Sequence, residues 1–185
     1  ILIHHISPFL DKWYMNFKVQ LFQVYPRFSP PYPIIYHDHH LDQDTEFQAL
    51  CDLLNIEYHT LRSFVHALSM QAVVERASAR QFGMHSQIDL QSTCFLSQDI
   101  SFIHEVIVSS QQILRSATPM ALSGVLRLMP ARQTLSVIST SILLFKAISL
   151  GVCETDLQSS LDILEACISA LNSSTLNDEF DFSSR

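Results

Sequence analysis

The stretch "TLSVISTSILLFKAISLGV", residues 134–152, is the most apolar segment of the chain and holds a single charge, Lys146. A transmembrane helix needs about 20 apolar residues, and this stretch reaches that length only when its serines and threonines are counted. The helices predicted around it are amphipathic, and an apolar helix at the centre of a bundle would cover their apolar sides. We therefore predict the central helix of a bundle, with a membrane-associated helical protein as the alternative.

The whole composition favours helices. The 185 residues suffice for one domain, 48% of them are apolar, and only three are glycine. Neither strand-like alternation nor an internal repeat is present. The predicted fold class is all-α, an irregular helical bundle. Its expected helices span residues 9–24, 45–83, 99–117, 130–151 and 155 onwards.

Several residues are typical of helix ends. Pro130 suits the first turn of a helix, and Gly83 and Gly151 suit the ends of two others. Pro119 is predicted to stop the helix before it, and residues 120–129 then form a connector with a short helical turn. Capping boxes are expected at Thr45 with Gln48 and at Thr155 with Gln158, and a kink is expected near "NIEYH", residues 55–59.

Apolar residues at helical spacing predict which side of each helix is buried. In the helix over 45–83 these are Leu50, Leu54, Leu61, Val65, Leu68 and Ala72. In the helix over 99–117 they are Ile100, Ile103, Ile107 and Leu114. In the last helix they are Leu157, Leu161, Leu164, Ile168 and Leu171.

Residues 25–44 are predicted to be a loop, because they begin with "YPRFSPPYP". The run that follows holds side chains of the kinds that bind metals: His37, Asp38, His39, His40, Asp42 and Asp44. All of them lie in one loop, without the paired spacing of a zinc site. The prediction is a solvated polar loop, with adventitious binding of divalent ions as the alternative and no metal site.

Charge and motifs exclude other functions. The formal net charge is −7, and the eleven Lys and Arg are scattered, so no basic face for duplex DNA is expected. The four cysteines form no C-x-x-C pair. The G-x-S-x-G motif of serine hydrolases is missing as well. The chain is therefore not expected to be an enzyme.

Three stretches resemble a known family. They are "IEYHTLRSFVHALSMQAVVERAS" at 56–78, "PARQTLSVISTSILLFKAISLG" at 130–151 and "DLQSSLDILEACISAL" at 156–171. Together they are similar to the middle homology region of fungal-specific zinc-cluster (Zn2Cys6) transcription factors, their large helical regulatory domain. The resemblance covers about residues 46–180.

The resemblance implies a nuclear regulator of transcription by RNA polymerase II. In this family six N-terminal cysteines hold two zinc ions and contact DNA. This sequence lacks those cysteines, so no cofactor is expected in the chain and DNA would be bound only through a missing N-terminal domain. Residues 1–45 would be a short helix plus a Pro/His-rich loop. Residues 46–185 would be a truncated regulatory domain, from a fragment or a mis-spliced gene model. The alternative is a stand-alone helical ligand-binding or protein-interaction module.

We also predict the partners and the candidate site residues of this chain. A second copy, the transcription machinery and a small-molecule effector are the expected partners. Arg132 and Lys146 are the candidate effector-binding residues, and the alternative is that charged residues only pair between helices. The pairs considered are Glu57 with Arg62, and Glu75 and Arg76 with Arg132. His59, His66 and His104 are expected to be on the surface or hydrogen-bonded.

Overall fold

The computed structural model describes residues 2–24, 41–83, 96–151 and 154–182, and within these residues it contains helices and no strand. The helices are α1 (Leu2–Val24), α2 (Leu41–Gly83), α3 (Ser97–Leu122), α4 (Val125–Leu128), α5 (Ala131–Ser149) and α6 (Glu154–Phe182). The predicted all-α fold class is confirmed.

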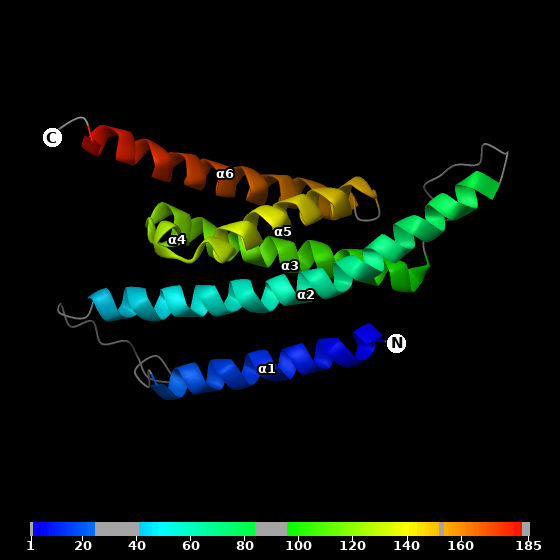
Figure 1. Ribbon diagram of the computed structural model, residues 1–185, viewed down its shortest axis with the longest axis horizontal. Coiled ribbons are helices and arrows are strands. Elements are labelled where there is room, and N and C mark those ends of the chain that lie inside the picture. The colour runs from blue at the N-terminus through cyan, green and yellow to red at the C-terminus, as the bar shows by residue number, and fades with distance from the viewer. Residues whose placement is uncertain (1, 25–40, 84–95, 152–153, 183–185) are drawn as a thin grey trace.

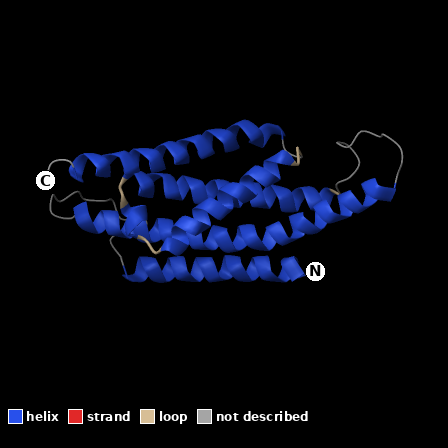
Figure 2. Ribbon diagram, turned by 45° about the horizontal axis from the view of Figure 1, so that its top comes forward, coloured by secondary structure: helices blue, strands red, loops and turns tan. Residues whose placement is uncertain are grey.

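The long helices form an antiparallel bundle. Figure 1 shows α1 and α2 along one edge, α6 along the opposite edge, and α3 and α5 between them. Successive long helices run in opposite directions, and the short helix α4 lies where the chain turns from α3 into α5. Turning the molecule by 45° shows the same arrangement (Figure 2).

The central helix is α3, which contacts α2, α4, α5 and α6. Its buried residues are distributed around the helix, and Ile103, Val106, Ile113 and Leu114 have no exposed surface. Each such side chain contributes about 1.5–3 kcal/mol to stability through burial. The core is therefore built around the middle of the chain.

The prediction that residues 134–152 form the central helix is wrong. In α5 the buried residues Gln133, Val137, Thr140, Leu144 and Ala147 recur every three or four positions, so they occupy one side. The opposite side is exposed and carries large apolar residues: Leu135, Ile138, Ile142 and Phe145. Hydropathy could not reveal this arrangement, because both sides of the helix contain apolar residues.

Helix ends are mostly as predicted. Pro130 directly precedes α5, and Gly83 is the last residue of α2. Gly151, which follows the C-terminal end of α5, has φ +68°, a backbone conformation that favours glycine. The expected short turn in the connector is α4. Its preceding residue, Gly124, has φ +74°.

Other boundaries differ from the predictions. α1 begins at Leu2 rather than residue 9, and α6 begins at Glu154, so Thr155 is not its N-cap. α2 begins at Leu41, which makes residues 41–44 helical and places Thr45 inside the helix. It is uninterrupted through residues 55–59. Residues 25–40, including His37, His39 and His40, lie outside the described residues.

Pro119 does not stop α3, which continues to Leu122. The hydroxyl of Thr118 donates to the carbonyl of Leu114 over 2.7 Å, and the amide of Ser123 donates to the carbonyl of Pro119 over 3.0 Å. These hydrogen bonds keep the helix continuous around Pro119. The missing amide donor of the proline therefore affects the helix only at that position.

The predicted apolar side of α2 is largely turned away from the core. Leu68 is 74% exposed and Leu61 is 41% exposed, whereas Ser63 is buried against α3 with its Oγ 3.5 Å from Oγ of Ser110. Small side chains let two helices approach closely. These serines carry no hydropathy signal, so the pattern of leucines pointed to the wrong side.

The same arrangement recurs where α6 meets α3. Ser160, Cys167 and Ala170 are buried, and Gln111 donates to Ser160 over 3.0 Å inside this contact. In contrast, Leu157, Leu161 and Ile168 of the predicted apolar side are exposed. No helix among the described residues is long and apolar enough to cross a membrane.

Candidate functional site

Arg132 and Lys146 do not form one binding site. They are fourteen positions apart on α5, which corresponds to about 21 Å along the helix axis. Arg132 pairs with Glu57 of α2, and Gln133 donates to the same carboxylate over 2.5 Å. Lys146 is exposed, and no carboxylate among the described residues forms an ion pair with it. No small anion could contact both cations at once.

The predicted ion pairs have other partners than expected. Glu57 pairs with Arg132 instead of Arg62, and Arg76 pairs with Asp99 of α3 over 2.6 Å instead of Glu75 or Arg132. Every one of these pairs joins two helices. The interpretation that the charges fix the relative positions of the helices therefore agrees with the geometry.

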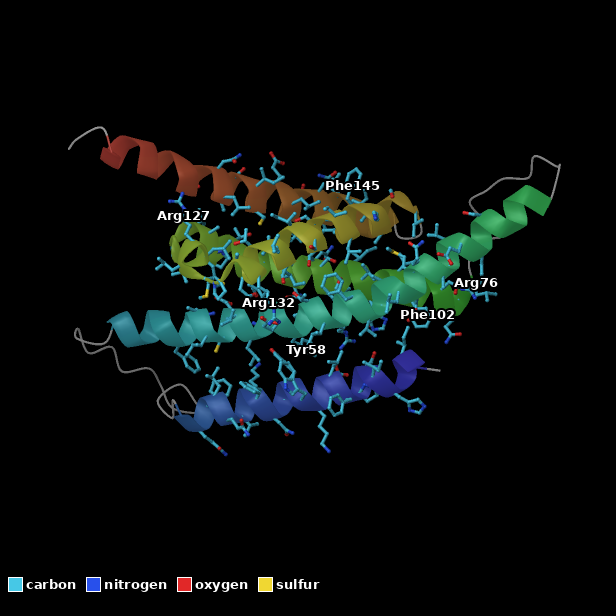
Figure 3. All side chains as sticks on the ribbon, viewed as in Figure 1. Tyr58, Arg76, Phe102, Arg127, Arg132 and Phe145 are labelled. Carbon is cyan, nitrogen blue, oxygen red and sulfur yellow. The ribbon has the colours of Figure 1, made fainter. Side chains whose placement is uncertain are left out.

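A polar cluster joins α1, α2 and α3. We call it the Arg62 cluster: Asp11, Tyr58, Arg62 and Glu105. Arg62 on α2 donates from Nη1 to Asp11 of α1 over 2.8 Å and from Nε to Glu105 of α3 over 3.0 Å. Tyr58 donates to Asp11 and accepts from Arg62 over 2.6 Å. Figure 3 shows Tyr58 between α2 and α1, where this cluster lies.

Further contacts hold α1 in the same place. The rings of Tyr14 and Tyr58 stack with centroids 4.3 Å apart, and Tyr14 donates to Asn55 over 2.5 Å. One helical turn beyond Arg62, Oγ of Ser7 lies 3.3 Å from Nε2 of His66. The docking of α1 therefore depends strongly on polar side chains.

Burial and charge shift the titration of this cluster. Burial lowers the pKa of Arg62, but the hydrogen bond and charge of Glu105 more than offset it, so its net shift is upward. Burial, helped by the bond to Asp11, raises the pKa of Tyr58. Burial and the charge of Arg62 lower the pKa of His59 to about 4. The guanidinium of Arg62 thus stays charged near neutral pH while the imidazole of His59 stays neutral.

The expectation of surface or hydrogen-bonded histidines is confirmed for His104, which is exposed, and for His66, whose Nε2 lies 3.3 Å from Oγ of Ser7. His66 is buried, His59 is half-buried, and Nδ1 of each has no hydrogen-bond partner among the described residues. A Ser–His–Asp triad needs a carboxylate on the imidazole nitrogen that faces away from the serine. Because Nδ1 of His66 has none within the described part of the chain, the Ser7–His66 contact lacks the arrangement of a hydrolase.

An open groove of about 510 Å³ lies between α2 and α3, lined by Ser69, Ala72, Glu75, Arg76 and Phe102. Figure 3 shows Arg76 and Phe102 near one end of the bundle. The charge of Arg76 is matched by Asp99, whose other oxygen accepts from the amide of Leu96 over 3.1 Å. With Glu75 beside it, the groove does not select an anion.

Metal binding and cysteine chemistry have little support within the described ranges. No group of three or more His, Cys, Asp or Glu side chains is placed there to hold a metal ion. Cys167 is buried and Cys51 is half-buried, and both are free thiols whose pKa is raised by burial. Cys94, Cys153 and four of the six candidate ligands in the His/Asp-rich run lie outside these ranges.

The described part of the chain is an antiparallel helical bundle whose charged residues pair between helices. The sequence is 36% identical over 177 residues to a protein of Aspergillus fumigatus named transcription factor hmgR. This similarity covers 96% of the chain but only 20% of that protein. The chain is thus related to one segment of a fungal transcription factor. No family model and no solved structure matches it.

The sequence indicated part of this site. Glu57, Arg62, Arg76 and Arg132 were singled out and all of them pair between helices. Asp11, Tyr58 and Glu105 were missed as members of the Arg62 cluster. The spacing of Tyr58 and Arg62 by four residues places them on one side of α2 and was an available signal. Nothing local could have linked them to Asp11, which is 51 positions from Arg62.

Proposed function

We propose that this chain is the regulatory helical part of a fungal zinc-cluster transcription factor, which acts in the nucleus on transcription by RNA polymerase II and does not itself contact DNA. The observation that carries the proposal is the similarity to transcription factor hmgR along nearly the whole chain. Zinc and DNA contacts would belong to an N-terminal cluster outside this sequence.

The charge of the chain supports a role without DNA contact. A DNA-binding surface needs free cations that replace the counterions of the phosphates. The net charge is −7, and Arg62, Arg76 and Arg132 are each neutralised by a carboxylate. The described surface therefore favours contacts with proteins over contacts with nucleic acid.

Variants at the native gene test this function. Arg62→Met should change the transcript levels of the target genes, while the occupancy of their promoters, normalised to the amount of protein, stays the same. Arg132→Met, which removes an arginine that is far more exposed than Arg62, is the matched control. Steeply salt-dependent binding of duplex DNA by the purified chain would contradict the proposal, because it would show direct phosphate contacts.

A second candidate function is a ligand-binding module that works without a DNA-binding half. One observation favours it, the groove beside Phe102 and Arg76. A ligand in this groove should raise the unfolding temperature of the chain in a metabolite screen, and Phe102→Ala should remove that rise. A rise that persists in Phe102→Ala would exclude the groove as the ligand site.

A further inference from the structure

The outer side of the α5–α6 hairpin is apolar and uncovered. We call it the α5–α6 face: Leu135, Ile138, Ile142, Phe145, Leu157, Leu161 and Ile168. The four side chains on α5 are 50–62% exposed, and the three on α6 are 39–56% exposed. Large apolar surfaces of this kind on soluble proteins mark sites of association.

The spacing of the face suits helix–helix packing. On α5 the large residues follow one another after three, four and three positions, which is the spacing of a coiled-coil seam. They lie opposite the side that packs on α3. Figure 3 shows Phe145 where α5 and α6 run next to each other, so the residues of both helices can meet one partner.

The large residues of α5 and α6 lie at matching heights along the two helix axes. Ile142 is seven positions before the end of α5, and Leu161 is seven positions after the start of α6. Leu135 and Ile168 are both fourteen positions from the same ends. In an antiparallel hairpin these pairs lie at equal heights. A twofold axis parallel to the helices would therefore place α5 over α6 of a second copy with large residues facing each other.

Charge favours this pairing over α5 against α5. On α5, Arg132 is already paired with Glu57 of the same chain, Lys146 is exposed, and no residue is acidic. α6 contains acidic residues, including Asp162 and Glu165, and no basic residue. Crossing α5 onto α6 of a second copy brings Lys146 towards an acidic helix in both contacts, whereas α5 on α5 brings the two Lys146 side chains together.

The exposed apolar area supplies about half of what a stable dimer buries. With about 120 Å² of apolar surface for a fully exposed side chain of this size, the exposed fractions amount to about 440 Å² per copy. A standard interface buries about 800 Å² per partner, and the polar rim around the face would supply the difference.

We propose that the α5–α6 face is a homodimer interface, in which α5 of each copy packs on α6 of the other around a twofold axis. The four helices then form a four-helix bundle whose seam consists of the seven residues of the face. This assembly is a property of the chain itself and does not depend on the proposed role in transcription.

Sedimentation velocity of the full 185-residue chain tests the interface. The chain should form dimers, and Ile142→Glu should weaken the dimer more than about tenfold, because it places a carboxylate in the apolar seam. Leu68→Glu on α2 is the matched control and should leave the dimer intact. A wild-type chain that stays monomeric at every concentration, or equal weakening by both variants, would overturn the proposal. Unchanged far-ultraviolet circular dichroism shows that each variant folds.

Disulfide trapping tests the pairing of helices. A chain with Ile142→Cys mixed with a chain carrying Leu161→Cys should give a linked dimer on mild oxidation, beyond the background of the wild-type chain. Ile142→Cys alone should not exceed that background. Linkage of Ile142→Cys to itself would indicate α5 on α5 and overturn the proposed pairing, and linkage in neither case would also contradict it.

Discussion

Replacing Arg62 with methionine should release α1 from the bundle before the core unfolds. Methionine keeps most of the length of the side chain but removes the charge and every hydrogen-bond donor. Asp11 on α1 and Glu105 on α3 would lose the guanidinium that lies between them. Two carboxylates would then remain near each other without a cation, and α1 would lose its strongest link to the rest of the molecule.

The magnitude follows from the exposure of the three side chains. The side chain of Arg62 is 23% exposed and that of Glu105 is 31% exposed. Because both charged groups are partly buried, we assign their hydrogen bond the usual value for bonds to charged groups, about 1.5–3 kcal/mol. Asp11 is 49% exposed, so its pair with Arg62 adds at most about 1 kcal/mol. We expect a total loss near 2 kcal/mol, which corresponds to a fall in Tm of about 4–8 °C for a chain of this length.

Hydrogen exchange and urea unfolding measure this loss. Amides of α1 should exchange up to about 5-fold faster in Arg62→Met, because the pair with Asp11 that holds α1 is worth at most about 1 kcal/mol. Arg132→Met is the control: this side chain is 70% exposed, and its loss should cost about 0.5 kcal/mol or less. The reasoning is refuted if both variants lose the same stability, or if the amides of α1 exchange at the same rate in Arg62→Met and in the wild-type chain.

Three further changes give separate outcomes. Because the pKa of His59 falls from 6.5 to about 4 on folding, the unfolded chain binds a proton first as the pH drops between these values. The free energy of unfolding should therefore decline as the pH falls over this range, by up to about 3 kcal/mol. In urea titrations at several pH values, His59→Gln should flatten the dependence of this free energy on pH. An unchanged dependence would contradict the assignment to His59. Gly151→Ala should cost about 1 kcal/mol in urea unfolding through its positive φ alone, since a Cβ there meets no atom within 4 Å; no measurable cost would argue against the left-handed backbone. Lys146→Met should change stability by less than about 0.5 kcal/mol because the lysine is exposed, and a larger loss in thermal unfolding would reveal a structural partner.

The sequence was sufficient to predict the helices and the buried side of α3, where Ile103, Ile107 and Leu114 are buried, but not the buried sides of α2, α5 and α6. Pro130, Gly83 and Gly151 act locally through their backbone preferences, so their positions could be predicted without a partner. The buried sides depend on close approach through Ser63, Ser110 and Ser160, which hydropathy treats as solvent-exposed. Leu61 and Leu68 of α2 and Leu157 and Leu161 of α6 instead lie on outer surfaces, while Leu164 and Leu171 pack against the core.

The candidate site shows the same limit. Charged residues that interrupt apolar patterns were correctly singled out as partners between helices, because isolated charges near a core need a counter-charge. Which charges meet depends on the order of the helices in space. Asp11 and Glu105 lie on helices far apart in the sequence, and only the docking of α1 beside α2 brings both to Arg62.

The polar docking of α1 also sets an order of events during synthesis. The ribosome releases α1 before α2 and α3, and Arg62 and Glu105 therefore follow later in the chain. At about 5–20 residues per second, α1 waits several seconds before Glu105 completes the cluster. During that time its exposed apolar residues, among them Phe9 and Phe17, are available to chaperones. Although α1 is made before α2 and α3, it is therefore expected to reach its final place after they have packed together.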